Sequence, residues 1–168
     1  MTIDTLHDKF VFELEEMYYV ENRLLEVLET MAADVSSDEL QEGLESHWEQ
    51  TKTQIDRLEE VFELIDEPVE ERPSPAFDAM IDERETFFEE AADGDMHDIH
   101  DLGAALKTEH FETAGYEDLI LLARKLDLDH GVRERLDENK YEEQTTKEEL
   151  TAMAEDSPVR EIFARLAG

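Results

Sequence analysis

Residues 102–126 have the pattern of an amphipathic helix whose apolar face contains acidic side chains. The stretch holds no proline, and its apolar residues recur at intervals of three and four, the spacing that places side chains on one face of a helix. Glu109, Glu112 and Tyr116 fall on that same face. Two carboxylates one turn apart on a buried face are costly unless something neutralises them. The fold must therefore bring a neutralising group to this position.

Helical periodicity and capping patterns predict further helices on both sides of this stretch. Thr5 with Asp8 forms an N-terminal cap pattern, and Ser36 with Glu39 forms a capping box. Three prolines between positions 68 and 75 interrupt any helix there. No run alternates at period two for long enough to form a strand. The predicted helices span residues 5–33, 36–65, 76–91, 97–126 and 132–154, with a short last helix over residues 157–166.

These elements predict an all-α protein: a four-helix bundle forming one domain over residues 1–168. The four long helices would form the bundle, with one short helix in a long crossover and another at the C-terminus. The connection between the second and third long helices covers about thirty residues. It is long enough to cross the bundle, so these two helices could run parallel. Residues 127–131 read as a turn with Asp129 as the cap of the next helix.

The other long helices also carry polar side chains near the middle of their apolar faces. They are Glu21 in the first helix, His47, Thr51 and Gln54 in the second, and Glu143 in the fourth. Side chains at mid-height on facing stripes of a bundle meet in its centre, as in dimetal carboxylate proteins. Two divalent cations would balance the four carboxylates. His47 or Gln54 would complete a ligand set suited to iron or manganese.

A metal-free polar layer is the alternative interpretation of the same residues. Buried carboxylates can share protons and hydrogen bonds. Lys147 lies one turn beyond Glu143 and would act as a counter-charge. The pattern alone leaves both interpretations open.

The charge of the chain narrows the range of partners. It has 48 acidic and 15 basic residues, a formal net charge of −33 and no cysteine. Such a surface repels nucleic acids and anionic membranes, and no disulfide or thiolate site is available. Because salt would screen the self-repulsion, the composition points to a halophile, with an acidic protein of a mesophile as the alternative. No apolar run approaches the length of a membrane span, and we expect a cytoplasmic protein.

Four segments resemble the YciF-like branch of the ferritin-like superfamily, which is related in site layout to the rubrerythrins. They are YYVENRLLEVLETMA, SHWEQTKTQIDRLEEVF, KTEHFETAGYEDLILLARKL and YEEQTTKEELTAMA. The resemblance covers nearly the whole chain and implies an antiparallel ferritin-like bundle, usually dimeric and linked with stress responses. On matching positions it implies candidate metal ligands at Glu21, Glu109, Glu112 and Glu143, with Gln54 nearby.

Two positions depart from the pattern of that family. Gln50 stands where the family typically has Glu, and Lys147 stands where it typically has Asp. A neutral amide thus replaces a possible ligand, and an amine supplies a positive charge that a metal would otherwise supply. A site with one metal ion, or with none, remains open beside a two-metal site.

Two candidate functions are compatible with both the resemblance and the residues. The first is a stress-associated protein that binds iron or manganese and acts on peroxide or dioxygen, with Tyr116 as a hydrogen-bonding or radical partner. The second is a metal-free, non-enzymatic, dimeric stress-response protein. A ferritin-type storage cage agrees less well with the sequence, because nothing in it indicates assembly into a closed shell. A two-fold homodimer is predicted from the apolar residues Phe77, Phe87, Phe88, Ile162 and Phe163.

Overall fold

The computed structural model describes residues 2–91, 94–156 and 164. Within these residues the chain forms five α-helices and no strand, so the all-α prediction is confirmed. The predicted ends of the helices differ from the observed ones by only a few residues. The predicted short last helix, with Ile162 and Phe163, lies outside the described residues. The helices are α1 (Leu6–Asp34), α2 (Asp38–Leu64), α3 (Pro75–Glu90), α4 (Gly94–Lys125) and α5 (His130–Asp156).

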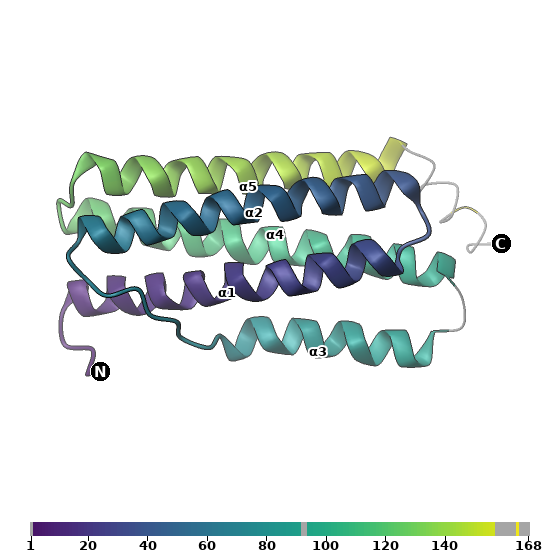
Figure 1. Ribbon diagram of the computed structural model, residues 1–168, viewed down its shortest axis with the longest axis horizontal. Coiled ribbons are helices and arrows are strands. Elements are labelled where there is room, and N and C mark those ends of the chain that lie inside the picture. The colour runs from purple at the N-terminus through teal and green to yellow at the C-terminus, as the bar shows by residue number, and fades with distance from the viewer. Residues whose placement is uncertain (1, 92–93, 157–163, 165–168) are drawn as a thin grey trace.

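Helices α1, α2, α4 and α5 lie side by side as a four-helix bundle, and α3 packs outside it against α4 (Figure 1). Around the bundle the contacting pairs are α1 with α2, α2 with α5, α5 with α4, and α4 with α1. Each helix runs antiparallel to both of its neighbours (Figure 1). The crossover that contains α3 makes α2 and α4 parallel, as the length of the connection predicts.

Local hydrogen bonds fix where the first two helices begin. Thr5 and Asp8 form the predicted capping box, in which the Asp8 amide donates to Thr5 Oγ1 (3.0 Å) and the Thr5 amide donates to Asp8 Oδ2 (2.8 Å). The predicted cap of α2 is wrong by one residue, because Ser37 occupies the N-cap and accepts from the Leu40 amide. Ser36 instead donates its hydroxyl (2.7 Å) and its amide (2.8 Å) to Asp98, which joins the α1–α2 turn to α4.

Helix α3 is attached to the bundle by one buried ion pair and by aromatic contacts. Arg84 donates from Nε to Asp101 Oδ1 (2.6 Å), and Arg84 is 6% exposed while Asp101 is fully buried. Phe77 is fully buried and packs against Phe111 of α4. Phe77 therefore contributes no surface to a dimer, contrary to the prediction. Phe87, which is half-buried, stacks on His100 of the same chain.

Apolar side chains fill both ends of the bundle and leave a polar layer between them. Near the N-terminal end of α1 and the C-terminal end of α2, the core includes Phe10, Leu14, Leu58, Phe62, Leu119 and Leu136. Near the opposite end it includes Leu24, Leu28, Leu40, Leu44, Leu102 and Leu150. Across the described ranges, no helix is long and apolar enough to cross a membrane. The middle level, between the two apolar clusters, is where the candidate site lies.

Candidate metal centre

The polar side chains predicted from the four apolar stripes do converge at mid-height in the bundle. Each central helix contributes at least one of them. His47 is 3% exposed, and the others are fully buried. They are Glu21 from α1, His47 and Gln54 from α2, Glu109 and Glu112 from α4, and Glu143 from α5.

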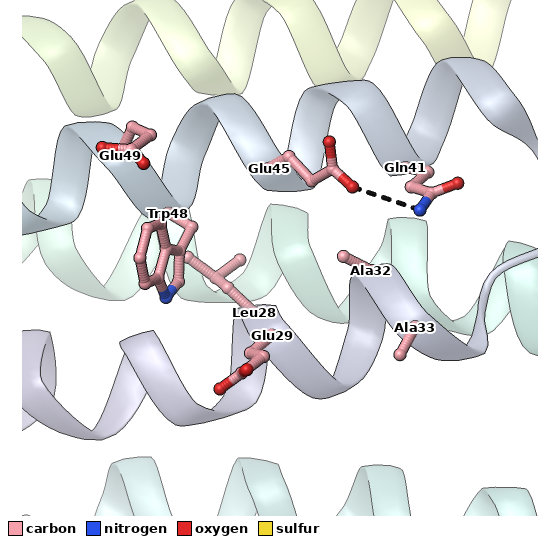
Figure 2. A pocket seen from close by; sticks show the side chains of 8 residues that line it. All are labelled: Leu28, Glu29, Ala32, Ala33, Gln41, Glu45, Trp48 and Glu49. Atoms are coloured by element: carbon pink, nitrogen blue, oxygen red, sulfur yellow. Dashed lines mark hydrogen bonds between the residues drawn. The ribbon is translucent and has the colours of Figure 1, made fainter.

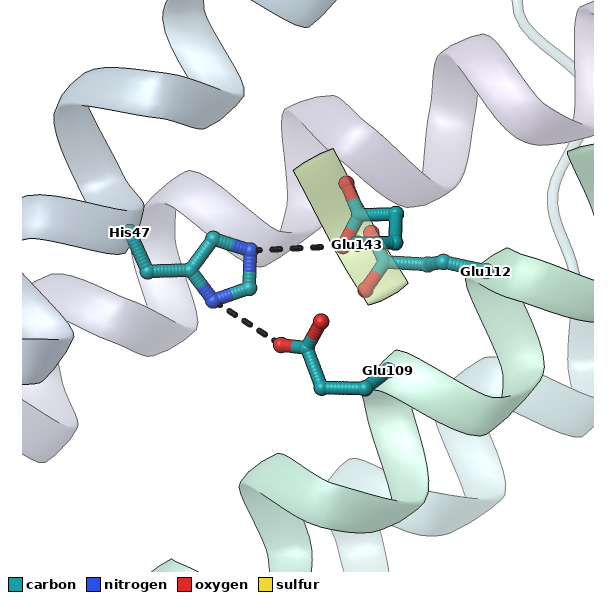
Figure 3. Close-up of side chains that lie close together, drawn as sticks. All are labelled: His47, Glu109, Glu112 and Glu143. Atoms are coloured by element: carbon teal, nitrogen blue, oxygen red, sulfur yellow. Dashed lines mark ion pairs between the residues drawn. The ribbon is translucent and has the colours of Figure 1, made fainter. Parts of the chain in front are cut away.

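Four of these residues surround a common point. Figure 3 shows His47, Glu109, Glu112 and Glu143 directed toward one another from α2, α4 and α5. Each offers one ligand atom, and these atoms all lie within 4.8 Å of one another. His47 Nδ1 lies 3.0 Å from Glu109 Oε1, and His47 Nε2 lies 3.7 Å from Glu143 Oε2. A cation with ligand bonds of about 2 Å holds neighbouring ligand atoms roughly 3 Å apart and opposite ones roughly 4 Å apart, so the four side chains would draw slightly closer together around one.

Glu21 and Gln54 join the cluster through hydrogen bonds. The Tyr116 hydroxyl donates to Glu21 Oε1, and the Gln54 amide donates to Glu143 Oε1. The charges of the Glu21, Glu109 and Glu143 carboxylates act on Glu112, and that of Glu109 acts on Glu143. The six side chains therefore form one electrostatically coupled group.

A buried chain of hydrogen bonds leads from this group toward the surface. Asn139 Nδ2 donates to the Tyr116 hydroxyl oxygen (2.9 Å) and to the main-chain carbonyl oxygen of Gln54 (3.2 Å). Arg57 Nη1 donates to Asn139 Oδ1 (3.0 Å) and to Glu142 Oε2 (2.7 Å). Sequence reasoning missed Asn139, although it is a polar residue between Leu136 and Glu143 in the apolar row of α5. That position is the signal that would have revealed it.

Most of the cluster's remaining polar atoms have no hydrogen-bond partner within the described part of the chain. Glu109 Oε1 is among them, because its contact with His47 lies outside the direction of a hydrogen bond. Native proteins leave few buried polar atoms unpaired, so such a concentration requires an explanation. The unpaired atoms are Glu21 Oε2, His47 Nε2, Gln54 Oε1, both carboxylate oxygens of Glu109 and of Glu112, and Glu143 Oε2.

Burial disfavours the ionised form of every carboxyl in the cluster. It raises the pKa of Glu21 to about 8, helped by the charge of Glu143, and it raises the pKa of Glu109 to about 8. Burial and the neighbouring carboxylates also raise the pKa of Glu112 well above its ordinary value, and burial raises that of Glu143. Without a cation the cluster must retain protons near neutral pH. A bound divalent cation would displace them.

The raised pKa values predict how the metal-free protein responds to pH. Because the folded-state pKa of Glu21 is about 8, against an ordinary 4.5, the folded state holds a proton that the unfolded state has lost. This contribution to stability is complete below about pH 4.5 and is lost as the pH rises through about 8. Glu21→Gln mimics the protonated form. In urea unfolding with chelator, it should therefore gain more than about 1 kcal/mol over wild type between pH 5 and 8.

The matched control is Glu29→Gln, at an exposed position of the same helix. It removes the same charge from α1 without touching the cluster, so it accounts for relief of surface repulsion. Equal pH dependence of Glu21→Gln and Glu29→Gln would show that Glu21 ionises normally in the fold.

Three further residues singled out in the sequence lie beside the cluster. The Thr51 hydroxyl donates to the His47 carbonyl (3.0 Å), a bond within α2. Gln50 Oε1 accepts from the Thr146 hydroxyl (3.0 Å), so this amide bridges α2 and α5. Lys147 is half-buried, and its charge acts to lower the pKa of Glu109. Lys147 thus offers partial compensation of the buried acid, as the alternative interpretation requires.

A groove of about 490 Å³ lies on the surface between α1 and α2. Figure 2 shows Trp48 extending from α2 toward α1, and Gln41 donating to Glu45 (3.1 Å) on the rim. None of the buried cluster residues lines this groove. The groove is therefore separate from the buried cluster.

The fold and the site define an antiparallel four-helix bundle with one long crossover and a buried centre of carboxylates and histidine. Comparison with known proteins gives the family. The chain belongs to the family described as Domain of unknown function (DUF892), whose model matches residues 5–162.

The relatives agree with the predicted resemblance. Protein YciF of Escherichia coli K12 is 29% identical over 155 residues, covering 92% of this chain and 93% of YciF. The crystal structure of the E. coli stress protein YciF has a TM-score of 0.85 and covers 90% of this chain and 96% of its own. YcfI of Rhodopseudomonas palustris, for which a structural role has been suggested, is 33% identical with a TM-score of 0.85, covering 89% and 94% of the two chains. The resemblance to YciF is thereby confirmed.

Proposed function

We propose that the buried cluster binds one or two divalent iron or manganese ions, in a stress-associated, ferritin-like protein that acts on peroxide or dioxygen. The observation that carries the proposal is the concentration of unpaired buried atoms on Glu21, His47, Glu109, Glu112 and Glu143. A cation would give ligand bonds to these atoms, which have no hydrogen bond from the described protein groups. It would also compensate the ionised carboxylates, whose burial is otherwise unfavourable.

The types of ligand favour iron or manganese over softer metals. The cluster offers carboxylate oxygens and one imidazole, and the chain has no cysteine. Oxygen donors with imidazole suit iron and manganese, whereas thiolates favour zinc or copper(I). A bundle with a single long crossover is also the topology of ferritin-like folds. The link with stress rests on the relative described as the stress protein YciF.

The protein's own groups would hold and orient such a centre. When bound, iron or manganese would supply Lewis-acid and redox chemistry toward peroxide or dioxygen. Glu109, Glu112 and Glu143 would bind the cation with His47, and Glu21 would bind on the α1 side. The Tyr116 hydroxyl and the Gln54 amide fix the directions of the Glu21 and Glu143 carboxylates. The apolar layers on both sides keep water away from the centre.

Titration of the metal-free protein with Mn²⁺ tests this proposal. Calorimetry should show at least one Mn²⁺ bound per chain. The double variant Gln50→Glu, Lys147→Asp adds two carboxylates and removes the neighbouring amine, so its stoichiometry should rise toward two. Wild type that gives no heat above dilution would contradict metal binding. The same stoichiometry in both proteins would contradict the role given to Gln50 and Lys147.

A metal-free, non-enzymatic stress-response protein is the second candidate function. The observation that favours it is the position of Lys147, whose charge acts on Glu109. The bond between Gln50 and Thr146 also gives that amide a structural role. In this alternative the carboxyls keep their protons and the bundle serves as a scaffold.

Either function is compatible with a two-fold homodimer, which we also propose. Phe88 and Phe87 on α3 are only half-buried within one chain, so a partner can cover them further. Light scattering in molar KCl should give twice the mass of one chain at micromolar concentration. Monomer alone over that range would contradict the dimer.

A further inference from the structure

The buried cluster has a groove directly outside its α1–α4 side. This groove, of about 240 Å³, is lined by Glu13, Glu16, Met17, Val20, Phe111, Ala114, Gly115 and Asp118. On α1, Met17 lies one helical turn before Glu21, and Val20 lies one residue before it. On α4, Phe111 directly precedes Glu112, and Gly115 follows it by about one turn. The groove thus lies over the segments that carry Glu21 and Glu112, although neither carboxylate lines it and both are fully buried.

One flexible side chain of this groove, Met17 on α1, packs against Gly115 on α4. A Cβ atom at Gly115 would overlap the terminal methyl of Met17, so that methyl occupies the space of the missing side chain. Met17 is 4% exposed. Methionine is unbranched and has three rotatable side-chain bonds. It can therefore change its side-chain conformation more readily than a branched side chain of similar size.

The charges at the mouth of the groove favour a cation. Glu13, Glu16 and Asp118 provide three carboxylates, while Lys9 contacts Glu13 and lies 3.6 Å from Asp118. The mouth therefore keeps an excess of negative charge after this pairing. A cleft lined by one sign of charge concentrates ions of the opposite sign and speeds their arrival.

Two of the other three seams around the cluster are less suitable as an entrance for a cation. The α2–α5 seam is bridged by Gln54 with Glu143, by Gln50 with Thr146, and by Arg57 with Glu142. Arg57 and Lys147 place positive charge on that side. The α1–α2 groove is lined on α2 by Trp48, next to His47, but it reaches α1 only at Leu28 and beyond, two turns from Glu21.

We propose that the α1–α4 groove is the route by which a divalent cation reaches the buried cluster, and that Met17, resting on Gly115, is its gate. This inference rests on the proposed metal-binding function. The gate controls the rates of binding and release but not the affinity, because Met17 supplies no ligand. An open arrangement of Met17 populated to about a tenth would slow passage about tenfold relative to an open groove.

Two variants with opposite effects test the route. Metal-free protein is mixed with Co²⁺ in a stopped-flow instrument at fixed KCl, and quenching of the only tryptophan, Trp48, beside His47, reports arrival. Met17→Ala should speed association and dissociation about tenfold and leave the Kd unchanged. Ala114→Phe, at an exposed position of the groove, should slow both rates at the same Kd. Ala114→Phe also keeps the test available if Met17→Ala fails to fold.

The controls separate gating from loosening of the bundle. Met31→Ala removes a buried methionine (2% exposed) from the same helix away from the groove, and Ala152→Phe enlarges an exposed alanine of α5. Both should bind Co²⁺ at the wild-type rates. Wild-type rates in Met17→Ala and Ala114→Phe, with intact equilibrium binding, would overturn the route alone. Acceleration by Met31→Ala equal to that by Met17→Ala would also overturn it. Wild type that binds no Co²⁺ at equilibrium would overturn the metal function and the route together.

Discussion

Replacing Glu112 by Gln should change stability in opposite directions with and without metal. Glu112 is fully buried, both its oxygens are unpaired, and three neighbouring carboxylates raise its pKa further. With Mn²⁺ present, Glu112→Gln removes a ligand, and we expect affinity to fall by at least about 100-fold. At a metal concentration of about 100 times the wild-type Kd, this loss removes up to about 2.7 kcal/mol of stabilisation. The variant should therefore melt at a lower temperature than wild type.

With chelator present the order should reverse. Glu112→Gln then removes one buried acid from a group of like charges, so the variant should be as stable as wild type or more stable. Glu117→Gln, at an exposed position of the same helix, is the control and should bind Mn²⁺ normally. Thermal melts and metal content are measured on the same samples. A variant that is no less stable than wild type in both conditions would contradict a metal role for Glu112.

Added KCl should raise the melting temperature by about 10 °C or more between low salt and molar salt, which corresponds to roughly 4 kcal/mol for a chain of this size. The chain carries 48 acidic and 15 basic residues, so repulsion among carboxylates dominates its surface. Salt also weakens favourable pairs such as Arg57 with Glu142. The excess of 33 negative charges makes the relief of repulsion the larger effect. Thermal melts over that range of KCl test the expectation.

A neutral osmolyte separates screening from general stabilisation. Sorbitol at matched osmolarity stabilises compact states by exclusion from the surface but does not screen charge. We expect KCl to exceed sorbitol by a wide margin. A melting temperature that is flat or falls with KCl would rule out both the screening argument and the proposed adaptation to high salt.

The sequence predicted the fold well because long helices carry a repeated signal. The apolar rows of α1, α2, α4 and α5 extend over many turns, and their ends are set by local caps such as Thr5 with Asp8. The cap of α2 was misplaced because Ser36 and Ser37 are adjacent and both suit an N-cap. Only Asp98, which is 62 residues away from Ser36, decides between them. Local patterns contain no such information.

The candidate site was predictable where a polar residue interrupts an apolar row. Glu21, Glu109, Glu112 and Glu143 all do so, and all are fully buried. Asn139 and Arg57 were not identified as part of it, because asparagine and arginine in a helix are usually explained by exposure. Their roles depend on the packing of α2 against α5, which brings Arg57 to Asn139. Phe77 was assigned to the surface because the pattern of α3 does not show which face meets α4.

The central claim is that the bundle core binds metal, and the composition of the native protein tests it most directly. Untagged protein is purified without chelator, and its metal content per chain is measured by elemental analysis. The buried centre of His47, Glu109, Glu112 and Glu143 predicts about one to two iron or manganese ions per chain. Folded protein without stoichiometric metal, which also fails to take up Fe²⁺ or Mn²⁺, would contradict the claim and leave the metal-free scaffold in its place.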